Sequence, residues 1–117
     1  MSLISMNMDT IDPPDLCSNI RDEIIICSRH LDVLYAVSLH QPIGIIKLAQ
    51  YLNLPQHQIR YSLRVLENSG YISAGAAGAT VPFEPHELAT RLQAEITTLM
   101  PNIDAFITHI QNKPHHS

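Results

Sequence analysis

The sequence predicts a mainly α-helical domain that carries one short β-hairpin. Apolar residues recur at intervals of three or four over most of the chain, which is the spacing of a helix face. Prolines and glycines interrupt this spacing where helices are expected to begin or end. Two short β-like pieces, YIS and TVPF, flank the alanine- and glycine-rich run AGAAGA, as strands flank the tip of a hairpin.

Length and composition favour one globular domain. The chain has 117 residues, of which 45% are hydrophobic, and it contains no Trp, so Leu, Ile, Val and Ala must form most of the core. No apolar run is long enough to span a bilayer. The N-terminus, MSLISMNMDTIDPPD, lacks the basic start and the long apolar stretch of a secretory signal. Cys17 and Cys27 form no C-x-x-C pair. From these features together we expect a cytoplasmic protein with reduced thiols and no membrane partner.

The N-terminal part is expected to be a flexible segment followed by a helical region. Residues 1–13 show no helical pattern, and the prolines at their end favour a helix start. From Asp15 to Leu39 there is no Gly or Pro. Apolar residues lie at positions 16, 20, 24, 27, 31, 34 and 37. This pattern fits one helix or two, because Ser28 can cap a second helix. The cysteines on this stripe are expected to be small buried hydrophobes.

A short helix and a tight turn are expected next. Ile43 and Gly44 form a short extended connector. The apolar face of the helix is made by Ile45, Leu48, Ala49 and Leu52. Asn53 and Leu54 then make the turn, and Pro55 suits the first position of the following helix.

The following helix has a core side and a polar side. Its core side is predicted to carry Ile59, Leu63 and Leu66, and Gly70 lies just past its last turn. At about 100° per residue, Arg60 falls on the flank of the opposite side. The residues on that opposite side are His57, Tyr61, Arg64 and Asn68. Two glutamines, Gln56 and Gln58, stand near the start of the helix.

The last third of the chain is expected to be one long helix. Apolar residues recur by threes and fours from Pro85 to Asn112. Residues 84–112 are therefore a candidate dimerisation helix, and residues 113–117 a flexible tail. The candidate interface is Leu88, Leu92, Ile96, Leu99, Ile103, Phe106 and Ile110. Pro101 cannot donate a hydrogen bond to the residue four positions earlier, so the helix should kink or restart there.

Charge is unevenly distributed along the chain. The net charge is −4, but residues 40–83 carry Lys47, Arg60 and Arg64 against Glu67 alone. A local positive excess of this kind can mark a nucleic-acid surface. Arg can donate two hydrogen bonds to guanine, Gln can reach adenine edges, and Tyr can contact phosphate or sugar. The candidate DNA-binding residues are Lys47, Gln56, His57, Gln58, Arg60, Tyr61 and Arg64.

The order helix, short turn, helix, hairpin is that of a winged helix-turn-helix, whose second helix enters the major groove of DNA. The stretch IIKLAQYLNLPQHQIRYSLRVLENSGYI resembles winged-helix transcription regulators of the ArsR/MarR-like type, found in archaea and bacteria. The resemblance covers about residues 29–83, within a winged-helix domain expected over residues 14–83. It implies sequence-specific binding of double-stranded DNA by a homodimer that regulates transcription.

One departure from the family lies in the hairpin. Family members often carry Arg or Lys at the tip between the two strands, whereas SAGAAGAT has no charge. Phosphate contacts supply much of the affinity for DNA, so a single subunit with few bases should bind DNA weakly.

Other interpretations remain open. Arg60 and Arg64 can simply solvate an exposed helix face, with Arg64 paired to Glu67. Lys47 and His57 can be ordinary polar surface residues, and Tyr61 can pack its ring on a neighbouring helix. A second function from another class is a winged-helix protein-interaction module, whose apolar hairpin and helices dock a partner protein without binding DNA.

A ligand- or metal-responsive sensor is a third interpretation. Cys27 and His30 are two ligand types at neighbouring helical positions, but a metal site needs at least one more ligand. Candidates for further ligands are Asp104, His109, His115 and His116, which do not match the spacing of metal-responsive family members. No metal site, cofactor or effector is predicted. No enzyme is expected either, because the chain has no Gly-rich phosphate loop, H-E-x-x-H or G-x-S-x-G motif.

Overall fold

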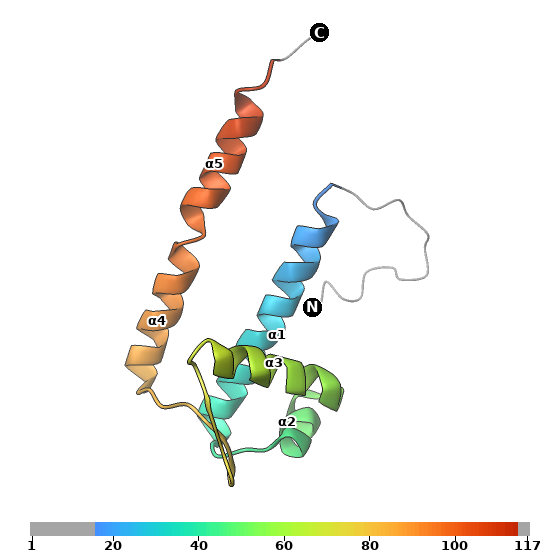
Figure 1. Cartoon of the computed structure of the whole chain (residues 1–117), viewed down its shortest axis with the longest axis vertical. Coiled ribbons are helices and arrows are strands. Elements are labelled where there is room, and N and C mark those ends of the chain that lie inside the picture. Colours follow the sequence, from blue (N-terminus) through green and yellow to red (C-terminus); the bar gives the residue numbers. More distant parts are fainter. Residues whose placement is uncertain (1–15, 115–117) are drawn as a thin grey trace. The chain divides into compact units, whose positions relative to one another are not determined.

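The structure is a computed structural model that describes residues 16–114. These residues form five α-helices and a two-stranded antiparallel hairpin (Figure 1). The mainly α fold, with one hairpin and a long C-terminal helical segment, agrees with the prediction from the sequence. The chain divides into two compact units, residues 1–82 and 83–117. The expected flexible N-terminus, residues 1–13, and the last three residues of the expected tail lie outside the described residues.

Helix α1, Ser18–His40, is a single helix of 23 residues. Ser28 caps no second helix, because its hydroxyl donates a hydrogen bond to the Ile24 carbonyl within α1, at 2.9 Å. The buried residues of α1 are Val33, Leu34, Ala36 and Val37, all in its C-terminal half. The N-terminal part of the apolar stripe is instead exposed, Cys27 included, because α2 and α3 lie against the C-terminal half of α1 (Figure 1). The expectation of a buried Cys27 is therefore wrong.

Helix α2, Ile45–Leu52, and helix α3, Gln56–Asn68, are joined by a turn of three residues. Asn53 takes the left-handed conformation, with φ of 55°, which a short polar side chain tolerates. The Leu54 N–H donates a hydrogen bond back to the last turn of α2, at 3.1 Å. Pro55 lies one position earlier than predicted: its backbone is extended, with ψ of 146°, and its carbonyl accepts the first hydrogen bonds of α3.

Gly70 ends α3 where the sequence predicts. It has φ of 82°, which glycine adopts without a steric penalty. The Gly70 N–H donates to the Glu67 carbonyl at 3.0 Å, and the Tyr71 N–H donates to the Leu66 carbonyl at 2.9 Å. This pair of bonds is a Schellman motif, which satisfies carbonyls at the helix end and turns the chain towards the hairpin.

The hairpin consists of β1, Ser73–Gly75, and β2, Gly78–Thr80, joined by a two-residue turn. Ile43 pairs with Ala79 on the other edge of β2. The Ala79 N–H donates to the Ile43 carbonyl at 2.8 Å, and the Ile43 N–H donates to the Ala79 carbonyl at 3.2 Å. The extended connector predicted at Ile43 thus holds the hairpin beside the start of α2.

The second unit contains α4, Pro85–Thr97, and α5, Met100–Gln111. The single long helix expected over residues 84–112 is therefore interrupted between Thr97 and Met100. Pro101 lies in the first turn of α5, where its missing N–H leaves no helical hydrogen bond unmade. An unbroken helix would have required that N–H to reach the carbonyl four positions earlier, so the helix restarts.

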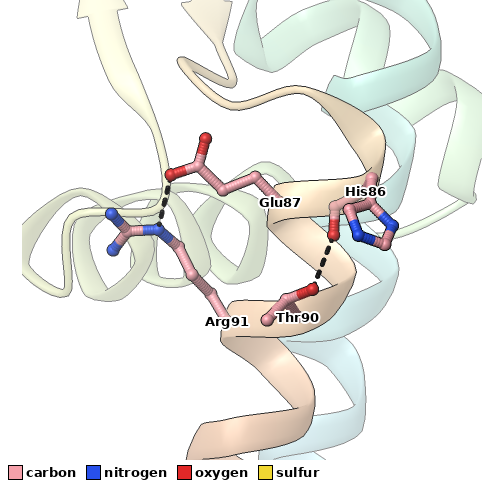
Figure 2. A network of polar contacts seen from close by, with 4 residues as sticks. All are labelled: His86, Glu87, Thr90 and Arg91. Carbon is pink, nitrogen blue, oxygen red and sulfur yellow. Dashed lines mark hydrogen bonds and ion pairs between the residues drawn. The ribbon is translucent and has the colours of Figure 1, made fainter.

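The first turns of α4 carry a small polar network (Figure 2). Arg91 Nε donates to Glu87 Oε2 at 3.4 Å, one helical turn earlier. The Thr90 hydroxyl donates to the His86 carbonyl at 3.0 Å. The Arg91 guanidinium also lies 4.2 Å from the centre of the Phe83 ring. Because both charged groups are more than half exposed, the ion pair contributes only about 0.3 kcal/mol.

The substitution Gly78→Ala should destabilise the first unit. Gly78 has φ of 129°, and a Cβ there would lie 2.7 Å from the backbone of Ile43. That backbone cannot yield without loss of its bridge to Ala79, so we expect the free energy of unfolding to fall by about 1–3 kcal/mol. Urea-induced unfolding followed by circular dichroism measures the change.

The matched control is Gly75→Ala, across the same hairpin. Its Cβ would meet the Gly78 carbonyl at 3.6 Å, an ordinary contact distance. It should change the free energy of unfolding by less than about 0.5 kcal/mol. Equal losses in the two variants would contradict the close approach of hairpin and connector as the reason for glycine at position 78.

Candidate functional site

Helix α3 has a packed face and a cationic face. Ile59, Ser62 and Leu66 are buried, with exposed fractions of 0%, 0% and 5%. His57, Arg60 and Arg64 are exposed and, by the helical period, lie on the opposite side. The helix therefore presents its charged and hydrogen-bonding side chains away from the packed face.

The other candidate residues surround this face. Gln56 is exposed at the start of α3, and Gln58 is half-buried beside it. Lys47 is exposed in the first turn of α2. Leu63, expected in the core, is only half-buried. The hairpin adds no charge, because its turn residues and β1 are Ser, Ala and Gly.

The cations of this region have no ionic partner of their own. Within residues 16–114 neither Arg60, Arg64 nor Lys47 forms an ion pair. The pairing of Arg64 with Glu67, which the sequence left open, is therefore absent from the described residues. Unpaired exposed guanidinium groups are free to bind an anion without first breaking an ion pair.

Lys47, Gln56 and Arg60 line one groove on the first unit. Its volume is about 540 Å³. The remaining lining residues are Pro42, Ile43, Gly44, Ile45, Ile46 and Ala77. The groove thus lies where the start of α2, the first turns of α3 and the hairpin turn meet. The other candidate residues, with Arg64 and His57 among them, do not line it.

Tyr61 leans against α1, at the flank of the cationic face. Its ring centre lies 5.6 Å from that of His30, with the ring planes tilted by 48°. The side chain is still 46% exposed. The alternative that Tyr61 packs on a neighbouring helix is therefore correct for one side of its ring.

A hydrogen bond between His30 and Ser62 links α1 to α3. His30 Nδ1 lies 2.8 Å from Ser62 Oγ, and either group can donate, according to the imidazole tautomer. Ser62 is fully buried, so its hydroxyl needs this partner. Arg29, the residue before His30, has a buried Nε without a hydrogen-bond partner among the described residues. Sequence reasoning missed Ser62, although its place between Ile59 and Leu66 on the apolar stripe was a usable signal.

His30 is held in its neutral form by its surroundings. Burial lowers its pKa below the usual 6.5, the nearby Arg29 guanidinium lowers it further, and Glu23 opposes both. Only a neutral imidazole nitrogen can accept the Ser62 hydroxyl proton. Burial and the Arg29 charge therefore favour the uncharged histidine at the α1–α3 contact.

The candidate dimer residues are unevenly exposed. Leu88 is buried, at 8% exposure, and Leu92 is half-buried. The other five expected interface residues, Ile96, Leu99, Ile103, Phe106 and Ile110, are between 47% and 52% exposed. Met100 and Ile107 are exposed beside them and were missed in the sequence. In the first unit, Ile20 and Ile24 on α1, with Leu16 just before that helix, form a second exposed apolar stripe.

Residues 16–114 contain no group of three or more His, Cys, Asp or Glu side chains that could hold a metal ion. Cys27 is exposed, whereas His30 is turned to Ser62. His115 and His116, the last ligands considered from the sequence, lie outside the described residues. Among the described helices, none combines the length and the apolar composition that crossing a membrane demands.

Comparison with known proteins found no match: no family model matches the chain, and no curated protein is significantly similar to it.

Stability should decrease on acidification because of His30. The unfolded imidazole has its usual pKa of 6.5, and the folded one has a lower pKa. Below about pH 6.5 the unfolded state therefore binds more protons, and the free energy of unfolding falls as the pH drops towards the folded-state pKa. Thermal unfolding between about pH 7.5 and about pH 5 measures this loss.

His30→Gln keeps an amide for Ser62 and removes the titrating group. The variant should lose this part of the pH dependence, so the difference in melting temperature between wild type and variant should shrink or reverse on acidification. Parallel pH profiles of the two proteins would contradict the assignment to His30.

Proposed function

We propose that the protein is a winged helix-turn-helix transcription regulator that binds double-stranded DNA as a homodimer. The observation that carries this proposal is the exposed, unpaired cationic face of α3, which starts directly after the three-residue turn from α2. The ArsR/MarR-like resemblance of residues 29–83 supports it. In this proposal the protein is a cytoplasmic regulator without enzymatic activity, and the hairpin is its wing.

The proposed recognition helix is α3. The major groove of DNA is about 12 Å wide and admits one α-helix with its side chains. Arg64 and His57 lie on the outermost side of α3, where base edges would be met. Helix α2 braces α3 from behind, as the first helix of a helix-turn-helix does. The packed face of α3, with Ile59 and Leu66, keeps this orientation fixed.

Affinity is the reason to propose a homodimer. Lys47, Arg60 and Arg64 offer only a few contacts per subunit, and each neutralised phosphate contributes to binding through counterion release. A two-fold dimer doubles these contacts and presents two recognition helices about 34 Å apart, one turn of DNA. Linking the subunits also raises the affinity, because once one recognition helix is bound, the second is already held at a high effective concentration near its half-site.

The proposed dimer surface is the apolar stripe of α4 and α5. Five of the predicted residues, from Ile96 to Ile110, are about half exposed, together with Met100 and Ile107. A continuous exposed stripe of this kind marks an interaction surface. A second copy is the simplest partner, because two-fold pairing uses the same patch twice.

Replacement of Arg64 by Ala should weaken DNA binding and relax its specificity. A base-reading Arg is worth about 1–3 kcal/mol, or about 5- to 160-fold in Kd. Arg64 is exposed, so its loss should not unfold the protein. Selection from a random duplex pool at low salt gives the preferred site, and mobility-shift titration of selected and scrambled duplexes then measures both effects.

Lys113→Ala is the charge-matched control, because it removes an exposed cation beyond the end of α5. It should leave Kd within about twofold. Equal losses in the two variants would mean that Arg64 acts only through net charge. If the wild type binds no duplex at all, the proposal fails in favour of a protein-interaction module.

Replacement of both Ile103 and Phe106 by Glu should convert the dimer into a monomer. The two charges would be buried at the proposed contact, where an unpaired charge costs several kcal/mol. Sedimentation equilibrium at micromolar concentration measures the oligomeric state. The matched control is Ala105→Glu with Thr108→Glu, on the opposite side of α5, which should remain dimeric. A monomeric wild type, or a dimeric Ile103/Phe106 variant, would rule out this interface.

A further inference from the structure

A single groove on the first unit gathers cations from two helices. Lys47 comes from the first turn of α2, and Arg60 comes from the second turn of α3. Gln56 adds an amide, and Ala77 of the hairpin turn also lines the groove. Both cations are exposed and have no ion pair within residues 16–114. Arg64 does not line the groove, although it lies only one helical turn from Arg60.

We infer that this groove holds one backbone phosphate of the bound DNA, so that Lys47 and Arg60 are phosphate-binding residues while Arg64 faces the bases. The inference rests on the proposed function and assigns different roles to the residues of the cationic face. The sequence made both arginines candidates for DNA contact, with Arg64 on the side opposite the core and Arg60 on its flank. The groove separates them, because only one of them lines it.

The chemistry of the lining selects an anion. The lining includes one Lys, one Arg and one Gln side chain, all hydrogen-bond donors, and it contains no Asp or Glu. The groove also includes Gly44, the residue at the N-terminus of α2, so the positive end of the α2 dipole adds to the cations. The Arg60 guanidinium can donate two parallel hydrogen bonds to phosphate oxygens, and the Lys47 ammonium acts as a point charge.

The apolar part of the lining suits the sugar next to that phosphate. Pro42, Ile43, Ile45, Ile46 and Ala77 form most of the remaining wall. A deoxyribose has an apolar ring face, which such a wall can contact without leaving a polar group unpaired. A nucleic-acid backbone, which alternates charged phosphate and less polar sugar, matches this lining better than a free multivalent anion does.

The position of the groove matches the path of a DNA strand. The major and minor grooves of DNA are separated by one sugar–phosphate strand. If α3 occupies the major groove, the element beside it faces that strand and then the minor groove. Arg60 of α3 and Ala77 of the hairpin turn both line this groove, so in this inference the strand passes between α3 and the hairpin.

Salt dependence distinguishes a phosphate contact from a base contact. Lys47→Gln and Arg60→Gln should each weaken binding to the selected and the scrambled duplex by the same factor. Each should also reduce the slope of log Kd against log salt by about one per subunit, or about two for a dimer. Arg64→Gln should instead reduce the preference for the selected duplex. Unchanged melting temperatures exclude unfolding as the cause, and Lys113→Gln again controls for net charge.

Neutral backbone probes identify the occupant of the groove. Methylphosphonate linkages, placed one at a time along each half-site, remove single phosphate charges. One position should weaken binding by the wild type but not by the Lys47→Gln/Arg60→Gln variant, because the contact is already lost there. If no position shows this coupling, or if Arg60→Gln lowers the preference for the selected duplex at an unchanged slope, the inference is wrong.

Failure of the proposed function gives a different result. If the wild type binds no duplex, DNA binding is excluded, and titration with inorganic phosphate then tests the groove. Saturable amide shifts in the NMR spectrum at Gly44 to Lys47, lost in Arg60→Gln, would support a phosphate site without DNA. An absence of such shifts would overturn the groove assignment as well.

Discussion

The hydrogen bond between His30 and Ser62 sets how α3 is rotated about its own axis. Ser62 is fully buried, and an unsatisfied hydroxyl there would cost about 1–3 kcal/mol. With Ser62 turned to α1, Ile59 and Leu66 point inward with it. A shift by one residue would turn α3 by about 100°, break this bond and expose Ile59 to water. The outward direction of Arg60 and Arg64 therefore follows from the packing of the inner face.

The second constraint places the hairpin beside α2. The paired hydrogen bonds between Ile43 and Ala79 fix β2 against the connector, and Gln41 Oε1 accepts the Val81 N–H at 2.7 Å just beyond it. Gly78 permits the close approach, since a Cβ would collide with the Ile43 backbone. Because Ile43 lies two residues before the start of α2, the same contacts bring the hairpin turn to the groove of Lys47 and Arg60. Core packing and strand pairing thus build different parts of one surface.

Local signals made much of this fold predictable. The helices, the turn at Asn53 and the end of α3 at Gly70 are each determined by residues close together in the sequence. The structure contains all of these features. Two features were not accessible to such signals. A period shows which residues share a face but not what covers it. It therefore could not show that Cys27, expected to be buried, is exposed along with Ile20 and Ile24. The groove joins segments far apart in the sequence, and its lining could not be read from any one of them.

In the proposed function, the distribution of charge would let an acidic chain favour DNA at one surface only. The acids lie mainly in residues 1–39 and 84–117, whereas Lys47, Arg60 and Arg64 stand together on α2 and α3. A net charge of −4 repels DNA from the rest of the molecule, so electrostatics contributes orientation more than affinity. The proposed weak attraction of each subunit for DNA would then make binding depend on whether two cationic faces act together. The exposed stripe of α4 and α5 would supply that link between subunits. Burial of its apolar residues would stabilise the dimer at any salt concentration, whereas contacts with phosphate weaken as the salt concentration rises.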